Sequence, residues 1–241
     1  MKFFWYNITT EIKGTTFVDR SRTSPLVVDF LNPHSFVTAM YDGTFFNALR
    51  KCNVLFPDGI GICGAISRVK HIKIKKIAGD DFHLQLLDEL DGIHGRIFYL
   101  GSRPEVLGRI IERINVEYPN ITIATHAPSY ARHLSVEENR IILNEIEDFA
   151  PDALLVGMTA PRQEKWIYSQ LQHLNTPKVI AAIGGAFEFY AGTERRAPKW
   201  ARDHYLEWMY RLVKRPIRMA RRNLVSTPKF LWYVFTHKKL M

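Results

Sequence analysis

Residues 184–222 read GGAFEFYAGTERRAPKWARDHYLEWMYRLVKRPIRMARR and join the end of a predicted strand to a long basic helix. The preceding apolar run, Val179–Ile183, is typical of a strand that is buried on both faces. Five cations of the helix share one face, as their spacing shows: Arg211, Lys214, Arg215, Arg218 and Arg222. Like charges at this spacing repel one another, so the helix needs an anionic partner.

The net charge of +9 is concentrated at the C-terminal end. Residues 194–241 carry 13 Lys or Arg and 3 Asp or Glu, a net charge of +10, whereas residues 1–193 have a net charge of −1. This asymmetry indicates a surface for a membrane, a nucleic acid or a phosphate-bearing ligand. Because no nucleic-acid-binding motif is recognisable and residues 1–193 have no basic surplus, we expect no nucleic-acid partner.

Short apolar runs alternate with helix-patterned segments. The predicted strands are Leu26–Phe30, Val54–Phe56, Arg96–Leu100, Ile121–Thr125, Ala153–Val156 and Val179–Ile183. The predicted helices lie near 34–50, 80–90, 104–117, 136–149, 162–173 and 198–222, the last kinked at Pro216. This alternation predicts an α/β fold with a Rossmann-like, mainly parallel sheet covered by helices on both faces, in residues 1–193. Residues 194–241 would form a basic, aromatic-rich helical appendage.

Features that the sequence lacks indicate the cellular compartment of the protein. Cys52 and Cys63 have no redox or metal spacing, which favours reduced thiols in a cytoplasmic protein. We find no signal peptide and no run of roughly 20 apolar residues that could span a bilayer. The nine histidines show no paired spacing, so no metal site is expected.

The turns after the predicted strands are the candidate ligand sites, because ligands bind at the carboxyl ends of parallel strands. Asn32, Asp58 and the pair Gly184–Gly185 each follow such a strand. Asp58 has two interpretations, a general base that accepts a proton from an attacking hydroxyl, or the cap of the next helix. The glycines after it would allow a sugar or phosphate to approach the backbone.

Two further segments carry alternatives. Residues 59–64 fit the G-x-G-x-x-G pattern of a dinucleotide site, with Asp80 or Asp81 at the distance of the ribose-binding acid. Residues 157–165, GMTAPRQEK, place an amide, a carboxylate and two cations at a helix start, which suits a phosphate or sugar hydroxyl but also a simply capped helix.

Residues 224–241, LVSTPKFLWYVFTHKKLM, follow the basic helix, which we expect Pro228 to end. They indicate either an interfacial membrane segment or a helix docked on the core.

Several long sequence motifs follow one another along the chain. They are Asp58-Gly59-x-Gly61, Gly157-x-x-x-Pro161-x-Gln163-Glu164-Lys165-Trp166-Ile167, Arg196-Ala197-Pro198-Lys199-Trp200 and Leu206-Glu207-Trp208-x-Tyr210-Arg211-Leu212. With them, residues 32–222 resemble the bacterial WecG/TagA/CpsF glycosyltransferases, glycosyltransferase family twenty-six. The resemblance implies an inverting, metal-independent and cofactor-free transfer of a sugar from a UDP-sugar. The acceptor would be a polyprenyl-diphosphate-linked saccharide at the anionic inner face of the cytoplasmic membrane.

The resemblance also implies roles for single residues of a catalytic domain at 1–193 and of the appendage. Asp58 matches the proposed base, Gln163 a substrate contact, and Lys76 and Asp81 a family arginine and carboxylate. The predicted substrate-binding residues are Asn32, Gly59, Gly61, Lys76, Asp81, Gln163, Gly184, Gly185, Arg196, Arg211, Arg218 and Arg222.

The chain departs from the family pattern at several positions. Phe30 stands where the family usually has threonine, and Glu188 where it commonly has aspartate. Phe30 therefore bears on the choice of donor sugar. Two other classes stay open: a non-catalytic module that binds membrane or nucleic acid, and another UDP-sugar enzyme such as an epimerase or hydrolase. The apolar segment Phe3–Tyr6 could pair as an edge strand in a homo-oligomer.

Overall fold

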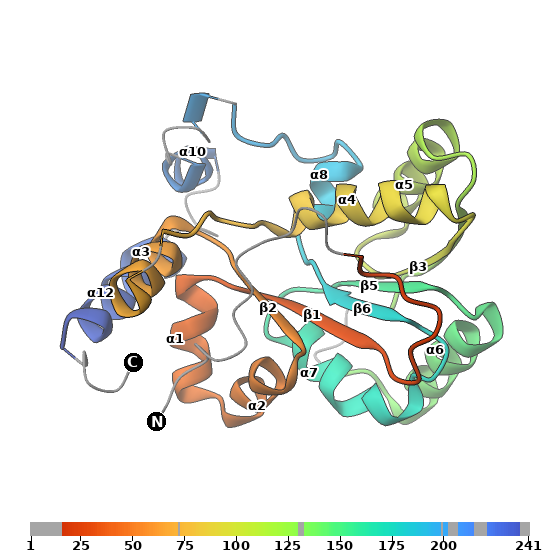
Figure 1. Ribbon diagram of the computed structural model, residues 1–241, viewed down its shortest axis with the longest axis horizontal. Helices are drawn as coiled ribbons and strands as arrows, with labels where there is room; N and C mark the ends of the chain where they lie inside the picture. Colours follow the sequence, from red (N-terminus) through yellow and green to blue (C-terminus); the bar gives the residue numbers. More distant parts are fainter. Residues whose placement is uncertain are drawn as a thin grey trace.

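A six-stranded, all-parallel sheet forms the centre of the protein, in the order β2-β1-β6-β5-β3-β4 (Figure 1). The computed structural model describes residues 16–71, 73–129, 133–198, 200–201, 207–214 and 221–236, without the side chains of 69, 70, 207, 211 and 221–223. The strands are β1 (Leu26–Leu31), β2 (Val54–Pro57), β3 (Arg96–Gly101), β4 (Thr122–His126), β5 (Ala153–Gly157) and β6 (Val179–Ala182). All six predicted strands are confirmed to within one residue, as is the mainly parallel α/β fold.

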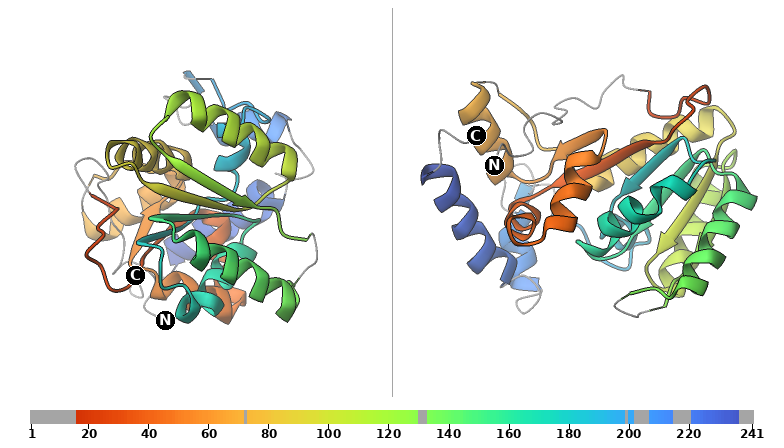
Figure 2. Two further views of the ribbon diagram at one scale, coloured as in Figure 1. Left: turned by 90° about the vertical axis from the view of Figure 1, so that its right-hand side faces the viewer. Right: turned by 90° about the horizontal axis from the view of Figure 1, so that it is seen from below.

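Helices cover both faces of the sheet (Figure 2). One face packs against α1 (Pro33–Tyr41), α2 (Gly43–Lys51), α6 (Val136–Phe149) and α7 (Arg162–Gln170) with the short η1 (Leu171–His173). The helices α3 (Ile60–Lys70) and α12 (Thr227–Thr236) share the same core cluster, and α12 contacts α1 and α3. The opposite face packs against α4 (Gly79–Gly92), α5 (Pro104–Glu117) and α8 (Ala186–Tyr190). Both layers bury the strands completely at the centre, since every residue of β6 is buried. Such double cover explains why the strands read as continuous apolar runs.

The helices that follow the neighbouring strands β1 and β6 lie on opposite faces, because α1 belongs to one core cluster and α8 to the other. Their N-terminal ends therefore diverge at the carboxyl edge of the sheet. In open α/β sheets such a divergence leaves the crevice in which ligands bind. The fold thus places a site beside Asn32 of the β1–α1 turn and Gly184 of the β6–α8 turn.

Two helix predictions on the first face need correction. The single helix expected over 34–50 is divided at Asp42, whose side chain accepts a hydrogen bond from the Phe45 N–H at 3.0 Å and caps α2. The second correction concerns residues 60–70, for which the sequence predicted no helix and which form α3 after Gly59. The capping side chain of Asp42 and the backbone of Gly59 set these two helix boundaries. Neither residue changes the apolar periodicity from which helices are predicted.

The C-terminal elements are α10 (Glu207–Lys214), the π-helix η2 (Arg221–Ser226) and α12. Pro228 lies in the first turn of α12, so the prediction that it ends a helix is wrong. Phe230 is fully buried and packs edge-on against Phe36 of α1, with ring centroids 5.1 Å apart. The tail segment is thus a helix docked on the core. Arg218 and Pro216, with the predicted kink, lie outside the described residues, as do Phe3–Tyr6 and the predicted oligomer contact.

The division into residues 1–193 and 194–241 stays a prediction, although α12 shares the core cluster of α1 and α3. Cys52 and Cys63 are both buried thiols that form no disulfide. Within the described ranges, no helix has the length and apolar character needed to cross a membrane.

Candidate active site

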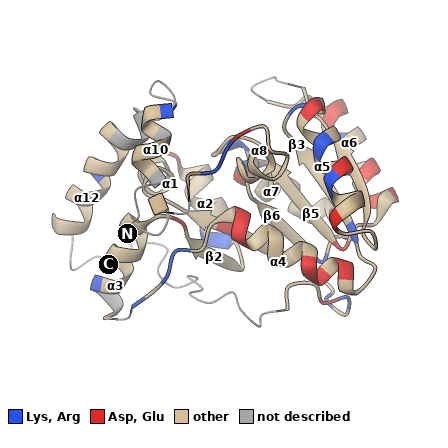
Figure 3. Ribbon diagram, turned by 90° about the horizontal axis from the view of Figure 1, so that it is seen from above, with Lys and Arg blue, Asp and Glu red and all other residues tan. Residues whose placement is uncertain are grey.

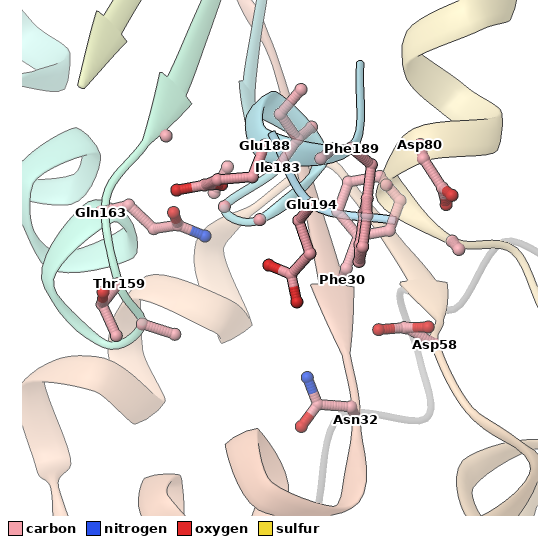
Figure 4. A pocket seen from close by; sticks show the side chains of 18 of the residues that line it. Phe30, Asn32, Asp58, Asp80, Thr159, Gln163, Ile183, Glu188, Phe189 and Glu194 are labelled. Carbon is pink, nitrogen blue, oxygen red and sulfur yellow. The ribbon is translucent and has the colours of Figure 1, made fainter. Parts of the chain in front are cut away.

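A cavity of about 490 Å³ opens at the carboxyl edge of the sheet between β1, β5 and β6. Its walls bring together five of the residues predicted from the sequence, Asn32, Asp58, Gln163, Gly184 and Gly185. They come from four separate turns of the chain. Figure 4 shows Asn32 and Asp58 projecting from one side and Thr159 and Gln163 from the other.

Asn32 occupies the turn between β1 and α1. Its side-chain oxygen caps α1 by accepting a hydrogen bond from the Ser35 N–H at 3.0 Å. The cap fixes the orientation of the amide, so its nitrogen turns toward the cavity (Figure 4). The group that Asn32 offers a ligand is therefore a hydrogen-bond donor.

Asp58 follows β2, and its backbone N–H donates to the carbonyl of Leu31 at 2.8 Å, which extends the pairing of β1 with β2. The carboxylate lines the cavity. The cap position of α3 belongs to Gly59 and not to Asp58. Of the two interpretations of this aspartate, the geometry favours a group that faces a ligand.

The glycines after Asp58 serve the fold. Gly59 has φ +102°, which other residues rarely adopt, and a Cβ at Gly61 would lie 3.1 Å from Cγ of Pro33 and 3.4 Å from Cε1 of Phe230. Both lie outside the cavity lining, so their role in substrate binding stays a prediction. The close side chains leave no space for a pyrophosphate at Gly61, and β2 is an edge strand, so the dinucleotide alternative is not supported.

The first turn of α7 supplies the opposite wall. Gln163 and Glu164 are both 4% exposed and line the cavity. The Gln163 amide nitrogen donates to Oε1 of Glu164 at 2.9 Å. Among the described residues, Oε1 of Gln163 and Oε2 of Glu164 have no hydrogen-bond partner. Buried acceptors without partners are costly, so a ligand that donates hydrogen bonds fits this wall.

The segment that enters the appendage folds back over the cavity. Thr193 and Glu194 are tied to α8, since the Glu194 N–H donates to the carbonyl of Glu188 at 3.0 Å. The carboxylate of Glu194 points into the space between Asn32 and Gln163 (Figure 4). These residues stand in a polar stretch without periodicity, so nothing in the sequence identified them.

The helix α10 contributes Tyr210 and Lys214, one turn apart, to the same cavity. Lys214 was part of the predicted cationic face, and it is the member of that face that the described lining contains. The side chains of Arg211 and Arg222 are not among those described, and Arg218 lies outside the described residues. Their predicted contact with a diphosphate therefore stays a prediction.

Arg196 lies beside the cavity and not in its lining. Its guanidinium pairs with Asp80 at 2.5 Å and with Asp81 at 3.0 Å, at the N-terminal end of α4. Figure 3 shows acidic residues at both ends of α4, and the N-terminal pair is the one that Arg196 meets. Asp80 lines the cavity, whereas Asp81 and Lys76 do not.

The described lining carries five carboxyl groups and two cations. The carboxyl groups are Asp58, Asp80, Glu164, Glu188 and Glu194, and the cations are Arg195 and Lys214. Within the described ranges, no three or more His, Cys, Asp or Glu side chains form a group that could hold a metal ion. The sequence identified Asp58 and named Asp80 and Glu188 in other contexts, but Arg195 emerged only from the folded chain.

The cavity therefore defines an α/β enzyme with a carboxylate at one strand end, a buried amide opposite, and cations from a C-terminal segment. The chain belongs to the WecG/TagA/CpsF family of glycosyl transferases, whose family model matches residues 9–240. The protein is a glycosyltransferase.

Three relatives share one name, N-acetylglucosaminyldiphosphoundecaprenol N-acetyl-beta-D-mannosaminyltransferase. The Bacillus subtilis (strain 168) protein is 33% identical over 214 residues, which cover 88% of this chain and 80% of the relative. The Bacillus spizizenii protein is 31% identical over 225 residues, 93% of this chain and 84% of the relative. The Staphylococcus aureus (strain MRSA252) protein is 30% identical over 229 residues, 93% and 85% of the two chains.

Gly184 tests whether the Gln163 wall matters for activity. Gly184 has φ +51°, and a Cβ there would lie 3.4 Å from Oε1 of Gln163. We expect Gly184→Ala to displace the amide and to lower transferase activity on the order of tenfold to a hundredfold. Gly192→Ala is the matched control, because its φ is +69° but nothing lies within 4 Å of the added Cβ. Equal losses of activity in the two variants would show that backbone strain, and not Gln163, is responsible.

Proposed function

We propose that the protein transfers a sugar from a UDP-sugar to a saccharide linked to a polyprenyl diphosphate, with inversion at the anomeric carbon and without a metal ion. The observation that carries the proposal is the placement of Asp58 across one cavity from Gln163 (Figure 4), with Lys214 of α10 in the same lining. The names of the three relatives support an acceptor of this kind. They also make UDP-N-acetylmannosamine the first donor to test.

In the proposed reaction, Asp58 accepts the proton of an acceptor hydroxyl as its oxygen attacks the anomeric carbon. The bond between that carbon and the diphosphate oxygen breaks, and UDP leaves from the opposite face, which inverts the configuration. Asn32 and Gln163 offer a donor and an acceptor of hydrogen bonds to the sugars between them.

The leaving diphosphate needs positive charge, and the described lining has more carboxyl groups than cations. Arg195 and Lys214 supply part of it. Three arginines were predicted for this role. Arg211 lies in α10, and Arg218 and Arg222 come after it in the sequence. We therefore propose that the C-terminal segment completes the donor site, with charge-assisted hydrogen bonds in place of a metal ion.

Release of UDP from a panel of UDP-sugars, measured with and without a polyprenyl-diphosphate-linked N-acetylglucosamine, tests the proposal. We expect release with at least one donor, only when the acceptor is present, and at an unchanged rate in EDTA. Release without acceptor would indicate a hydrolase, and loss in EDTA would refute metal independence. If the protein released no UDP but bound anionic vesicles, it would instead be the non-catalytic module that binds membrane.

We also propose a peripheral position on the inner face of the cytoplasmic membrane. The face of α12 opposite Phe230 exposes Trp232 (64%) and Phe235 (58%), and aromatic side chains near lysines suit a membrane interface. Sedimentation with anionic vesicles tests this position. We expect Trp232→Asp to bind severalfold more weakly, and Val116→Asp, an exposed site on α5, to bind like the wild type. Equal binding by the three proteins would contradict it.

A further inference from the structure

Two carboxyl groups are buried together behind the Gln163 wall of the cavity. Asp29 is 3% exposed in the middle of β1, and Glu164 is 4% exposed in the first turn of α7. Oδ1 of Asp29 accepts a hydrogen bond from the Phe30 N–H at 2.8 Å. An ionised carboxylate is costly to bury unless a cation or several donors compensate it.

The neighbouring groups do not supply that compensation. Lys165, the next residue of α7, forms an ion pair with Asp42 at the start of α2. The pKa of the Cys52 thiol, at the end of α2, is raised first by burial and second by the negative charge of Asp29. The strand β6, which also packs against α7, contains only Val179–Ala182. Of these neighbours, the lysine is already paired, and the thiol and the strand β6 supply no positive charge.

Both carboxyl groups consequently retain protons more readily than usual. Burial raises the pKa of Glu164 to about 7. The pKa of Asp29 lies well above its ordinary value, because of burial first and the charge of Glu164 second. Near neutral pH the pair therefore carries at least one proton, as two interacting acids do when ionisation of both is unfavourable.

Glu164 is also the hydrogen-bond partner of Gln163. Its Oε1 accepts from the amide nitrogen at 2.9 Å, and this contact leaves the amide oxygen without a partner among the described residues. Gly184 contributes no side chain on the other side of the amide, where a Cβ would lie 3.4 Å from the oxygen. The direction of the amide, and so its use as an acceptor, depends on Glu164.

We propose that Glu164 is a positioning residue of this site: by accepting the N–H of the Gln163 amide, it fixes that amide so that its oxygen accepts a hydrogen bond from a hydroxyl or acetamido N–H of the donor sugar. The inference rests on the proposed function, because it takes a sugar as the ligand of Gln163. Loss of the proton places a second negative charge in an apolar interface beside a diphosphate substrate. Donor binding therefore weakens as the pair ionises.

The pH dependence of KM for the donor tests this role. In the wild type, KM rises by about tenfold per pH unit above the apparent pKa of the pair. Glu164→Gln keeps an acceptor for the Gln163 amide and cannot ionise at this position, so its KM rises much less than that of the wild type above pH 7. Glu164→Ala removes the acceptor and raises KM at every pH. An unchanged alkaline rise in Glu164→Gln overturns the proposal.

Thermal unfolding supplies a readout that does not depend on activity. A carboxyl whose pKa is raised by folding contributes stability that is fully present below its ordinary pKa of 4.5 and is lost as the pH rises to about 7. The melting temperature of the wild type therefore falls relative to that of Glu164→Gln between pH 4.5 and 7. Parallel curves overturn the raised pKa of the Glu164 carboxyl even if no transfer is detected. A missing transfer with diverging curves refutes the proposed function, and with it the role of Glu164 toward a sugar.

Discussion

We expect Asp58→Asn to lower kcat by about 10²–10⁴-fold, with little change in the KM of the donor. Asparagine keeps the shape and the hydrogen bonding of the side chain but cannot accept the proton of the attacking hydroxyl. Steady-state rates of UDP release measure the effect. Asp58 lies outside α3 and lines the cavity, so the melting temperature should remain that of the wild type.

Glu188→Gln is the matched control for this variant. It also removes a negative charge from the cavity, and the contact that the Glu188 carboxylate makes with the hydroxyl of Ser102 is long, at 3.4 Å. We expect less than about a tenfold change in kcat, because Glu188 lies on the α8 side, away from the proposed attacking hydroxyl. If Glu188→Gln abolished the reaction and Asp58→Asn did not, the base would be Glu188.

Phe230→Ala should destabilise the protein by about 3–5 kcal/mol, the range of a large aromatic deletion in a core. The Phe230 ring is fully buried between α1 and α3, edge-on to Phe36 and close to Gly61. Its removal would loosen α12 from the two helices that begin at Asn32 and Gly59. Denaturant unfolding gives the free energy, and we also expect a lower rate of transfer.

Phe235→Ala provides the control on the same helix. Phe235 is 58% exposed, and its ring receives the guanidinium of Arg68 at 5.5 Å, an interaction that contributes about 0.5–1 kcal/mol at an exposed site. Its loss should therefore cost no more than about 1 kcal/mol. Similar costs for both variants would mean that α12 does not dock on the core in solution.

The parts of the fold that the sequence predicted are those that follow from burial on both faces. Strands such as β5 and β6 contain only apolar side chains and end at glycine or polar turns, which made their positions recognisable. The rule that ligands bind at carboxyl ends of parallel strands then placed Asn32, Asp58 and Gly184 in one cavity, as the structure shows.

The remaining features depend on contacts between distant segments. A single capping side chain, Asp42, divides the first helix, and Pro228 begins a helix because Phe230 finds space on α1. Glu194 and Lys214 reach the cavity only because the chain folds back over it after α8. Asp29 is one carboxyl in an otherwise apolar strand, a pattern that indicates a buried polar group but does not identify Glu164 as its neighbour.

The mass of the lipid-linked acceptor after incubation with the donor tests the central claim most directly. The account predicts that wild-type enzyme adds one sugar residue to polyprenyl-diphosphate-linked N-acetylglucosamine, with one UDP released per product, and that Asp58→Asn leaves the acceptor mass unchanged. An acceptor of unchanged mass with every UDP-sugar tested, whether or not UDP appears, would contradict it.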